Sequence, residues 1–334
     1  MEPVTVSAGP RAVIRVDISD VAPPGCKELA LEVIPPAAGP DEPRAVLVCF
    51  PGGGMTRRYF DLPVPGYSFA RYAADHGFLI VLADHPGTGD SDAPDDGWSL
   101  TPGAVASIEA AAVDRALAML RAGDVDGIAP LAPTTTVIGV AHSMGAHLLI
   151  HQAARLRRES SGLYAGLALL GWAGRGLPQY LDADDLTLGQ LDATDPEAFA
   201  VQLVASARRR FPDPLPLGRG GSAELLIKNP MTAEVRQALL DVRAPLLAVC
   251  GHASMIPGTA RRAAAAVDVP VFLGVGEHDI ATSHHLIPNE FPASDDITLY
   301  VLPGAGHNQN VEPRREELWK RVTSWADQLA ARRK

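Results

Sequence analysis

The stretch Val137-Ile138-Gly139-Val140-Ala141-His142-Ser143-Met144-Gly145 decides the fold of this chain. The apolar run 136–141 predicts a buried strand, and a helical pattern follows over 147–155. Between them, the residues fit the pattern small-x-Ser-x-Gly. A turn tight enough to expose a serine hydroxyl crowds the positions two before and two after it, so both must be small. The stretch therefore predicts a strand–turn–helix unit in which Ser143 is a nucleophile.

Strand and helix patterns alternate on both sides of this unit. Apolar runs predict buried strands at 45–50, 78–83, 136–141, 165–170, 269–275 and 297–302. Helical patterns cover 67–76, 103–121 and 313–333. Near the N-terminus, 12–18 and 27–34 predict an antiparallel pair. This alternation predicts an α/β protein with a mostly parallel central sheet of about eight strands, flanked by helices on both faces.

The alternation breaks over residues 172–244. Acidic patches, several prolines and two helical stretches, at 197–209 and 233–240, replace it. We interpret 172–244 as a helical lid inserted into a core domain that consists of 1–171 and 245–334. Connecting helices with no gating role are the alternative interpretation.

Composition and charge limit which partners and cofactors we expect. Hydrophobic residues make up 47% of the chain, enough for a substantial core, and the formal net charge of −10 disfavours nucleic acid. No run of about 18 apolar residues predicts a membrane span, and no signal peptide is evident, so we expect a cytoplasmic protein. The three cysteines are widely separated and the ten histidines are scattered, so we expect no metal and no cofactor. The sequence 251–255, followed by Pro257 and Gly258, predicts a loop.

Several motifs in order make the chain similar to α/β-hydrolases. The motif Phe50-Pro51-Gly52-Gly53-Gly54 ends a strand where that family has its oxyanion loop. The motif Asp84-His85-Pro86-Gly87-Thr88-Gly89-Asp90-Ser91 resembles the turn after the family's next strand. Gly276-Glu277-His278-Asp279 and Gly304-Ala305-Gly306-His307 follow late strands, as the acid and histidine loops of the family do. The resemblance runs from about residue 12 to the C-terminus, except for the lid.

The resemblance implies a catalytic triad of Ser143, Asp279 and His307. A serine hydroxyl is a weak nucleophile near neutral pH and needs a base. His307 is the last histidine of the chain and lies in a Gly-rich loop after a strand, which fits the family order Ser, Asp, His. Asp279 has the family position for the acid that orients the histidine, and Glu277 is the fallback.

The oxyanion hole should consist of backbone N–H groups. The resemblance implies that Met144 supplies one of these N–H groups and Gly53 the other. Gly54 is the second choice for the other donor, because this chain has Pro51 where the family often has histidine. Met55 and Trp172 are the residues expected to line the substrate pocket.

A serine nucleophile predicts acyl transfer to water. If the lid covers an apolar pocket, the expected small-molecule substrate is a moderately large hydrophobic ester or lactone. An aspartate in its place would have indicated haloalkane or epoxide hydrolysis. Thioester and carbon–carbon bond hydrolysis use the same triad and stay open. A cofactor-free perhydrolase or oxygenase and a non-catalytic hydrolase-like binding protein are further alternatives.

Overall fold

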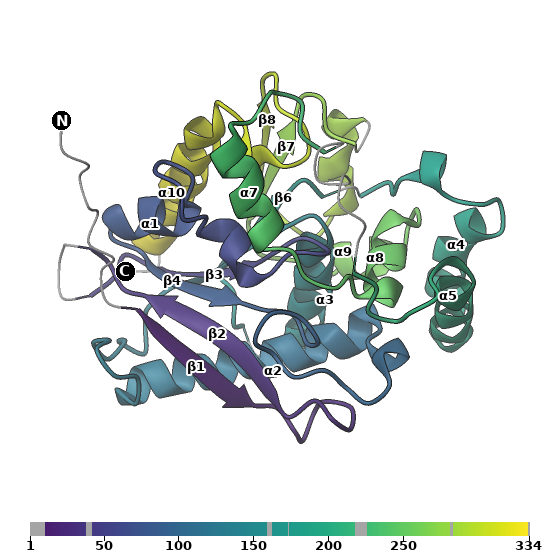
Figure 1. The fold of residues 1–334 in the computed structure, drawn as a ribbon, viewed down its shortest axis with the longest axis horizontal. Coiled ribbons are helices and arrows are strands. Elements are labelled where there is room, and N and C mark those ends of the chain that lie inside the picture. Colours follow the sequence, from purple (N-terminus) through teal and green to yellow (C-terminus); the bar gives the residue numbers. More distant parts are fainter. Residues whose placement is uncertain are drawn as a thin grey trace.

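An eight-stranded sheet forms the centre of the molecule (Figure 1). The computed structural model describes residues 11–37, 42–158, 162–172, 174–217, 226–280 and 283–332. The strands are β1 (Ala12–Asp17), β2 (Glu28–Ile34), β3 (Val46–Phe50), β4 (Leu79–Ala83), β5 (Val137–His142), β6 (Gly166–Leu170), β7 (Val271–Gly276) and β8 (Ile297–Leu302). Their order across the sheet is β1-β2-β4-β3-β5-β6-β7-β8.

The pairing confirms the predicted fold class. Strands β1 and β2 are antiparallel to each other, and β2 is antiparallel to β4. All other neighbours are parallel, from β4 through β3, β5, β6 and β7 to β8. The inner strands are buried on both faces, which explains why they appear in the sequence as continuous apolar runs.

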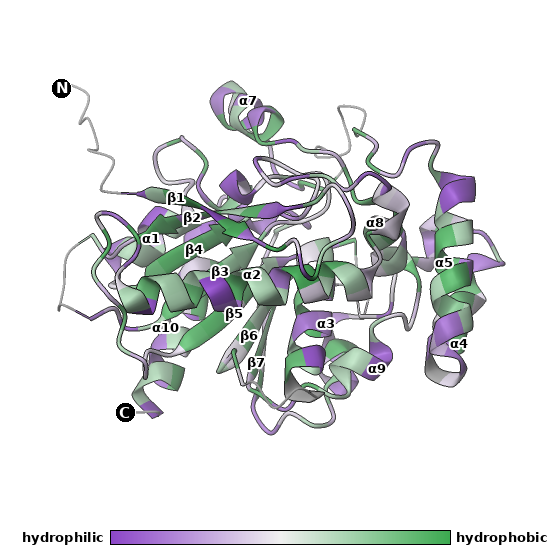
Figure 2. Cartoon of the chain, turned by 90° about the horizontal axis from the view of Figure 1, so that it is seen from below, coloured by the Kyte–Doolittle hydropathy of each residue, from purple (hydrophilic) through white to green (hydrophobic). Residues whose placement is uncertain are grey.

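Helices cover both faces of the sheet. Successive side chains of β3 point to opposite faces, so Val46, Val48 and Phe50 pack with α2 (Pro102–Ala122) and α3 (Met144–Arg158). Leu47 and Cys49 instead join the cluster that contains α1 (Phe69–Asp75) and α10 (Arg315–Arg332). In Figure 2 the inner strands form a largely hydrophobic layer between these helices.

The chain between β6 and β7 forms a group of helices. They are α4 (Leu188–Thr194), α5 (Pro196–Arg210), α7 (Ala233–Asp241), α8 (Ala248–Met255) and α9 (Arg261–Ala264). Both helical stretches expected here are therefore confirmed, as α5 and α7. Helices α4 and α5 lie side by side at one end of the molecule in both views (Figures 1 and 2). The division of the chain into a core and a lid at 172–244 stays a prediction.

The prediction of a loop at 251–255 is wrong, because α8 includes these residues. Pro257 and Gly258 lie beyond the last helical residue, Met255, and follow the helix end instead of preventing the helix. The apolar and small residues of α8 are buried almost throughout.

Candidate active site

The candidate residues lie in loops at one edge of the sheet. Strands β3, β5, β7 and β8 are parallel, so their carboxyl ends meet at this edge. The Gly-rich loop 52–54 follows β3, and Ser143 follows β5. Asp279 follows β7, and His307 follows β8. Topology alone therefore collects residues that are far apart in the sequence.

Ser143 has the strained backbone that the turn requires. Its φ angle is 52°, in the left-handed region that non-glycine residues rarely adopt, and α3 begins at the next residue. Its N–H donates to the Leu170 carbonyl at 2.8 Å, which ties the turn to β6. A side chain at Gly145 would place a Cβ 2.2 Å from the Pro51 carbonyl oxygen. Glycine is therefore required here because two backbone segments meet.

Ser143, His307 and Asp279 form a continuous hydrogen-bonded chain. His307 Nε2 lies 2.8 Å from Ser143 Oγ, and His307 Nδ1 lies 2.7 Å from Asp279 Oδ1. The side chains of His307 and Asp279 are 3% and 0% exposed, so water does not compete for the bond between them. The arrangement can remove a proton from the serine hydroxyl while the carboxylate holds the imidazole in one tautomer.

The Asp279 carboxylate has a second donor. Gln309 Nε2 donates to Asp279 Oδ2 at 2.8 Å, which fixes the plane of the carboxylate. The fallback acid, Glu277, is exposed, and its carboxylate accepts from the Gly304 N–H at 2.7 Å. Asp279, not Glu277, is thus the acid that contacts His307. Sequence reasoning missed Gln309, although its position two residues after His307 was an available signal.

The loop 52–54 lies against the start of α3. A Cβ at Gly53 would lie 3.3 Å from Met144 Sδ, so the two residues expected to form the oxyanion hole are neighbours. Within the described part of the chain, the Gly53 N–H has no protein acceptor. Met144 is the first residue of α3, so its N–H has no acceptor within the helix. Gly54, the second choice, has a φ of 78°, and its carbonyl accepts from the Ala244 N–H at 2.9 Å.

His142 contacts the loop that carries His307. Its Nε2 donates to the backbone carbonyl of His307 at 2.9 Å, and the two rings are 4.9 Å apart. Burial, together with the neighbouring His307, lowers the pKa of His142 to about 3, so it is neutral at physiological pH. Sequence reasoning gave His142 no role, because adjacency to the nucleophile does not reveal which loop the ring contacts.

The two residues predicted to line the pocket lie in well-packed surroundings. Trp172 is 3% exposed and its ring packs on Phe291 at 5.2 Å, while Met55 forms an isolated bridge with Arg243. Neither of them lines either of the two cavities described for this structure, so their contact with substrate stays a prediction.

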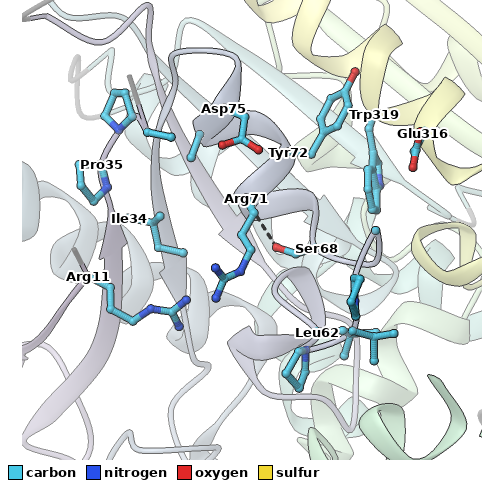
Figure 3. A pocket seen from close by; sticks show the side chains of 17 residues that line it. Arg11, Ile34, Pro35, Leu62, Ser68, Arg71, Tyr72, Asp75, Glu316 and Trp319 are labelled. Carbon is cyan, nitrogen blue, oxygen red and sulfur yellow. Dashed lines mark hydrogen bonds between the residues drawn. The ribbon is translucent and has the colours of Figure 1, made fainter. Parts of the chain in front are cut away.

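The larger of these cavities, of about 820 Å³, lies between the end of β2, α1 and α10 (Figure 3). Arg11 and Arg71 line it, and both pair with the buried Asp61. No member of the triad contributes to its walls.

The prediction that the histidines are scattered is wrong for two of them. His147 and His151 form a His-x-x-x-His pair on α3, with rings 5.0 Å apart. Across the described ranges, no group of three or more His, Cys, Asp or Glu side chains could hold a metal ion. The same ranges contain no helix with the length and apolarity needed to cross a membrane.

Comparison with known proteins identifies the family. Residues 47–318 match the alpha/beta hydrolase family. The chain belongs to this family. No curated protein matches this α/β-hydrolase in sequence.

Solved structures share its fold at low sequence identity. A monoacylglycerol lipase from Paleococcus ferrophilus is 18% identical, with a TM-score of 0.60, over 90% of this chain and 99% of that chain. A proline iminopeptidase from Mycobacterium smegmatis is 20% identical, with a TM-score of 0.59, over 97% and 100%. A haloalkane dehalogenase variant from Bradyrhizobium elkanii is 15% identical, with a TM-score of 0.60, over 96% and 98%. The activities in these names differ, so the likeness establishes the fold, and the chemistry must be argued from the site.

Proposed function

We propose that this α/β-hydrolase cleaves a carboxylic ester or lactone through an acyl-enzyme on Ser143. The observation that carries the proposal is the unbroken chain from Ser143 Oγ to His307 at 2.8 Å and on to Asp279 at 2.7 Å. The nucleophile is a hydroxyl next to a base, which suits attack on a carbonyl carbon. A likeness in fold to a haloalkane dehalogenase does not transfer that activity to a serine site.

Each step of the reaction has a group in place. As Ser143 Oγ attacks the carbonyl carbon, His307 Nε2 takes its proton, and Asp279 stabilises the imidazolium. The developing oxyanion accepts hydrogen bonds from the N–H groups of Gly53 and Met144. When the tetrahedral intermediate collapses, His307 returns the proton to the leaving alkoxide. Water then releases the acyl group from Ser143 by the same steps in reverse.

The surroundings of Gly53 support an apolar acyl group. A Cβ at Gly53 would lie 2.6 Å from Leu246 Cδ1 and 3.3 Å from Met144 Sδ, so two apolar side chains border the expected oxyanion hole. Leu246 is partly exposed, and its segment is tied to the oxyanion loop by the Ala244 N–H that donates to Gly54. These contacts favour a hydrophobic ester or lactone over a highly polar one.

The test combines active-site labelling with a substrate screen. The protein is incubated with an alkyl phosphonate fluoride, and the adduct is located by mass spectrometry; we expect it on Ser143, with none in Ser143→Ala and a greatly slowed reaction in His307→Ala. Chromogenic esters, lactones and thioesters of graded acyl length are then compared by kcat/KM. Absence of both labelling and turnover would refute the proposal. Highest kcat/KM for thioesters would correct the substrate class but keep the mechanism.

A further inference from the structure

A chain of buried polar side chains leads to the oxyanion loop. The Tyr164 hydroxyl donates to Gln152 Oε1 at 2.9 Å, and Gln152 Nε2 donates to Glu109 Oε2 at 2.6 Å. The other carboxylate oxygen of Glu109 lies 2.5 Å from His85 Nδ1, and His85 Nε2 lies 2.9 Å from the Pro51 carbonyl oxygen. All four polar side chains are at most 4% exposed. None of them belongs to the triad, and burial of so many polar groups calls for an explanation.

The hydrogen bonds fix the proton count of this chain. Both ring nitrogens of His85 face oxygen atoms, and the Pro51 carbonyl can only accept a hydrogen bond. A neutral imidazole has a single N–H, so a second proton must lie between His85 Nδ1 and Glu109, whichever atom holds it. Burial opposes protonation of His85, but the charge and hydrogen bond of Glu109 outweigh it and raise the pKa of His85. The pair therefore keeps the Nε2–H directed at Pro51.

The Pro51 carbonyl has two close neighbours. His85 donates to it, and the first turn of α3 lies against it, where a Cβ at Gly145 would come within 2.2 Å of the oxygen. This carbonyl belongs to the peptide that joins Pro51 to Gly52. Fixing that peptide plane fixes the N and Cα atoms of Gly52, from which the chain continues to Gly53. The next peptide, which contains the Gly53 N–H, is restrained by the Met55 N–H that donates to the Gly52 carbonyl at 3.3 Å.

We propose that His85 is a positioning residue for the oxyanion hole, held by Glu109 with its Nε2–H directed at the Pro51 carbonyl. Its hydrogen bond to the Pro51 carbonyl sets the Gly53 N–H at the place where the oxyanion develops. The inference rests on the proposed function, because it assigns a role in stabilising a transition state. A donor that is misplaced acts like a donor that is lost, and loss of one oxyanion donor lowers kcat by about 10²–10³.

Three variants separate positioning from stability. His85→Leu removes the donor to Pro51, and we expect kcat to fall by about 10², with little change in KM. The affinity for an alkylboronic acid, which forms a tetrahedral adduct with the serine, should fall by a similar factor. His85→Gln offers a side-chain N–H in the same region and should restore much of kcat. Tyr164→Phe, the matched control at the far end, should lower stability and leave kcat unchanged.

A second measurement needs no turnover and applies to the wild-type protein. With ¹⁵N-labelled histidine, NMR should show a protonated Nε2 on His85, assigned by its loss in His85→Gln. Amide hydrogen exchange over residues 51–56 should be faster in His85→Leu than in Tyr164→Phe. An unprotonated Nε2, or equal exchange in the two variants, would overturn the inference.

The outcomes keep this inference apart from the proposed function. If folded His85→Leu retains wild-type kcat and boronate affinity while the wild type is labelled on Ser143, the positioning role fails and the serine hydrolase stands. If the wild type is neither labelled nor active, the proposed function fails, and the Nε2–H of His85 with the exchange rates decides whether His85 positions the loop.

Discussion

The contact at Gly145 permits a quantitative prediction. A Cβ there would lie 2.2 Å from the Pro51 carbonyl oxygen and 2.8 Å from that of Phe50. Carbon and oxygen atoms in close contact lie about 3.3 Å apart, so Gly145→Ala requires the start of α3 and the oxyanion loop to separate by about 1 Å. Both neighbours are backbone atoms, so a change of rotamer cannot relieve the contact. Because a misplacement of about 1 Å can cost about 10² in rate, we expect kcat/KM to fall by about 10².

The assay measures kcat/KM with a short-chain chromogenic ester and the free energy of unfolding in urea. Overpacking should also lower the stability of Gly145→Ala by about 1–3 kcal/mol. Gly103→Ala is the matched control, since a Cβ on Gly103 meets no atom within 4 Å. The control should keep full activity and wild-type or slightly higher stability. If folded Gly145→Ala hydrolyses the ester at the wild-type rate, this contact does not position the oxyanion loop.

Three further predictions concern the acid, a buried ion pair and pH. Asp279→Asn should lower kcat by about 10⁴ because the amide favours the wrong tautomer of the catalytic histidine, whereas Glu277→Gln should leave kcat unchanged; comparable losses would contradict the assignment. Arg57→Met leaves the fully buried Asp84 carboxylate without its charged partner and should lower the free energy of unfolding in urea by about 3–5 kcal/mol. A loss below about 1 kcal/mol would show that the ion pair does not stabilise the fold. The pKa of His142 is lowered by burial from 6.5 to about 3, so between these pH values the unfolded chain binds a proton that the folded chain does not. Stability from this group is present above pH 6.5 and is lost as pH falls, by up to about 1.4 kcal/mol per pH unit. The free energy of unfolding of the wild type should therefore fall more steeply with falling pH than that of His142→Gln. Equal slopes of unfolding free energy against pH would contradict the shift.

The strands and the nucleophile turn could be predicted because their signals are local. Strand β8 spans Ile297–Leu302 as expected, and strand β3 starts one residue later than predicted. A parallel strand with helices on both faces must be apolar throughout, so its sequence is distinctive. The turn at Ser143 needs small neighbours for steric reasons that no distant residue alters. Helix α8 was missed because the Pro-Gly signal after it marks where a helix ends, and does not exclude one before it.

The site was predictable as a set of loops but not as a set of contacts. Chain order and the family resemblance indicate Ser143, Asp279 and His307, and parallel pairing accounts for their meeting at one edge of the sheet. The choice of Asp279 over Glu277 as the contact of His307 depended on which carboxylate the β7 loop turns inward. Apart from the family position of Asp279, two residues of the same charge in one loop leave no signal in the sequence that separates them.

By itself, the sequence determined an α/β sheet, a serine held in a strained turn and the loops that carry an acid and a histidine. Only the tertiary structure decided that His142 contacts the His307 carbonyl and that Glu109 and His85 link α2 to the Pro51 carbonyl. The physical reason is the range of the interactions. Hydropathy and steric demands act between near neighbours and repeat with a period. A buried hydrogen bond between α2 and the loop after β4 instead exists only after the chain has packed.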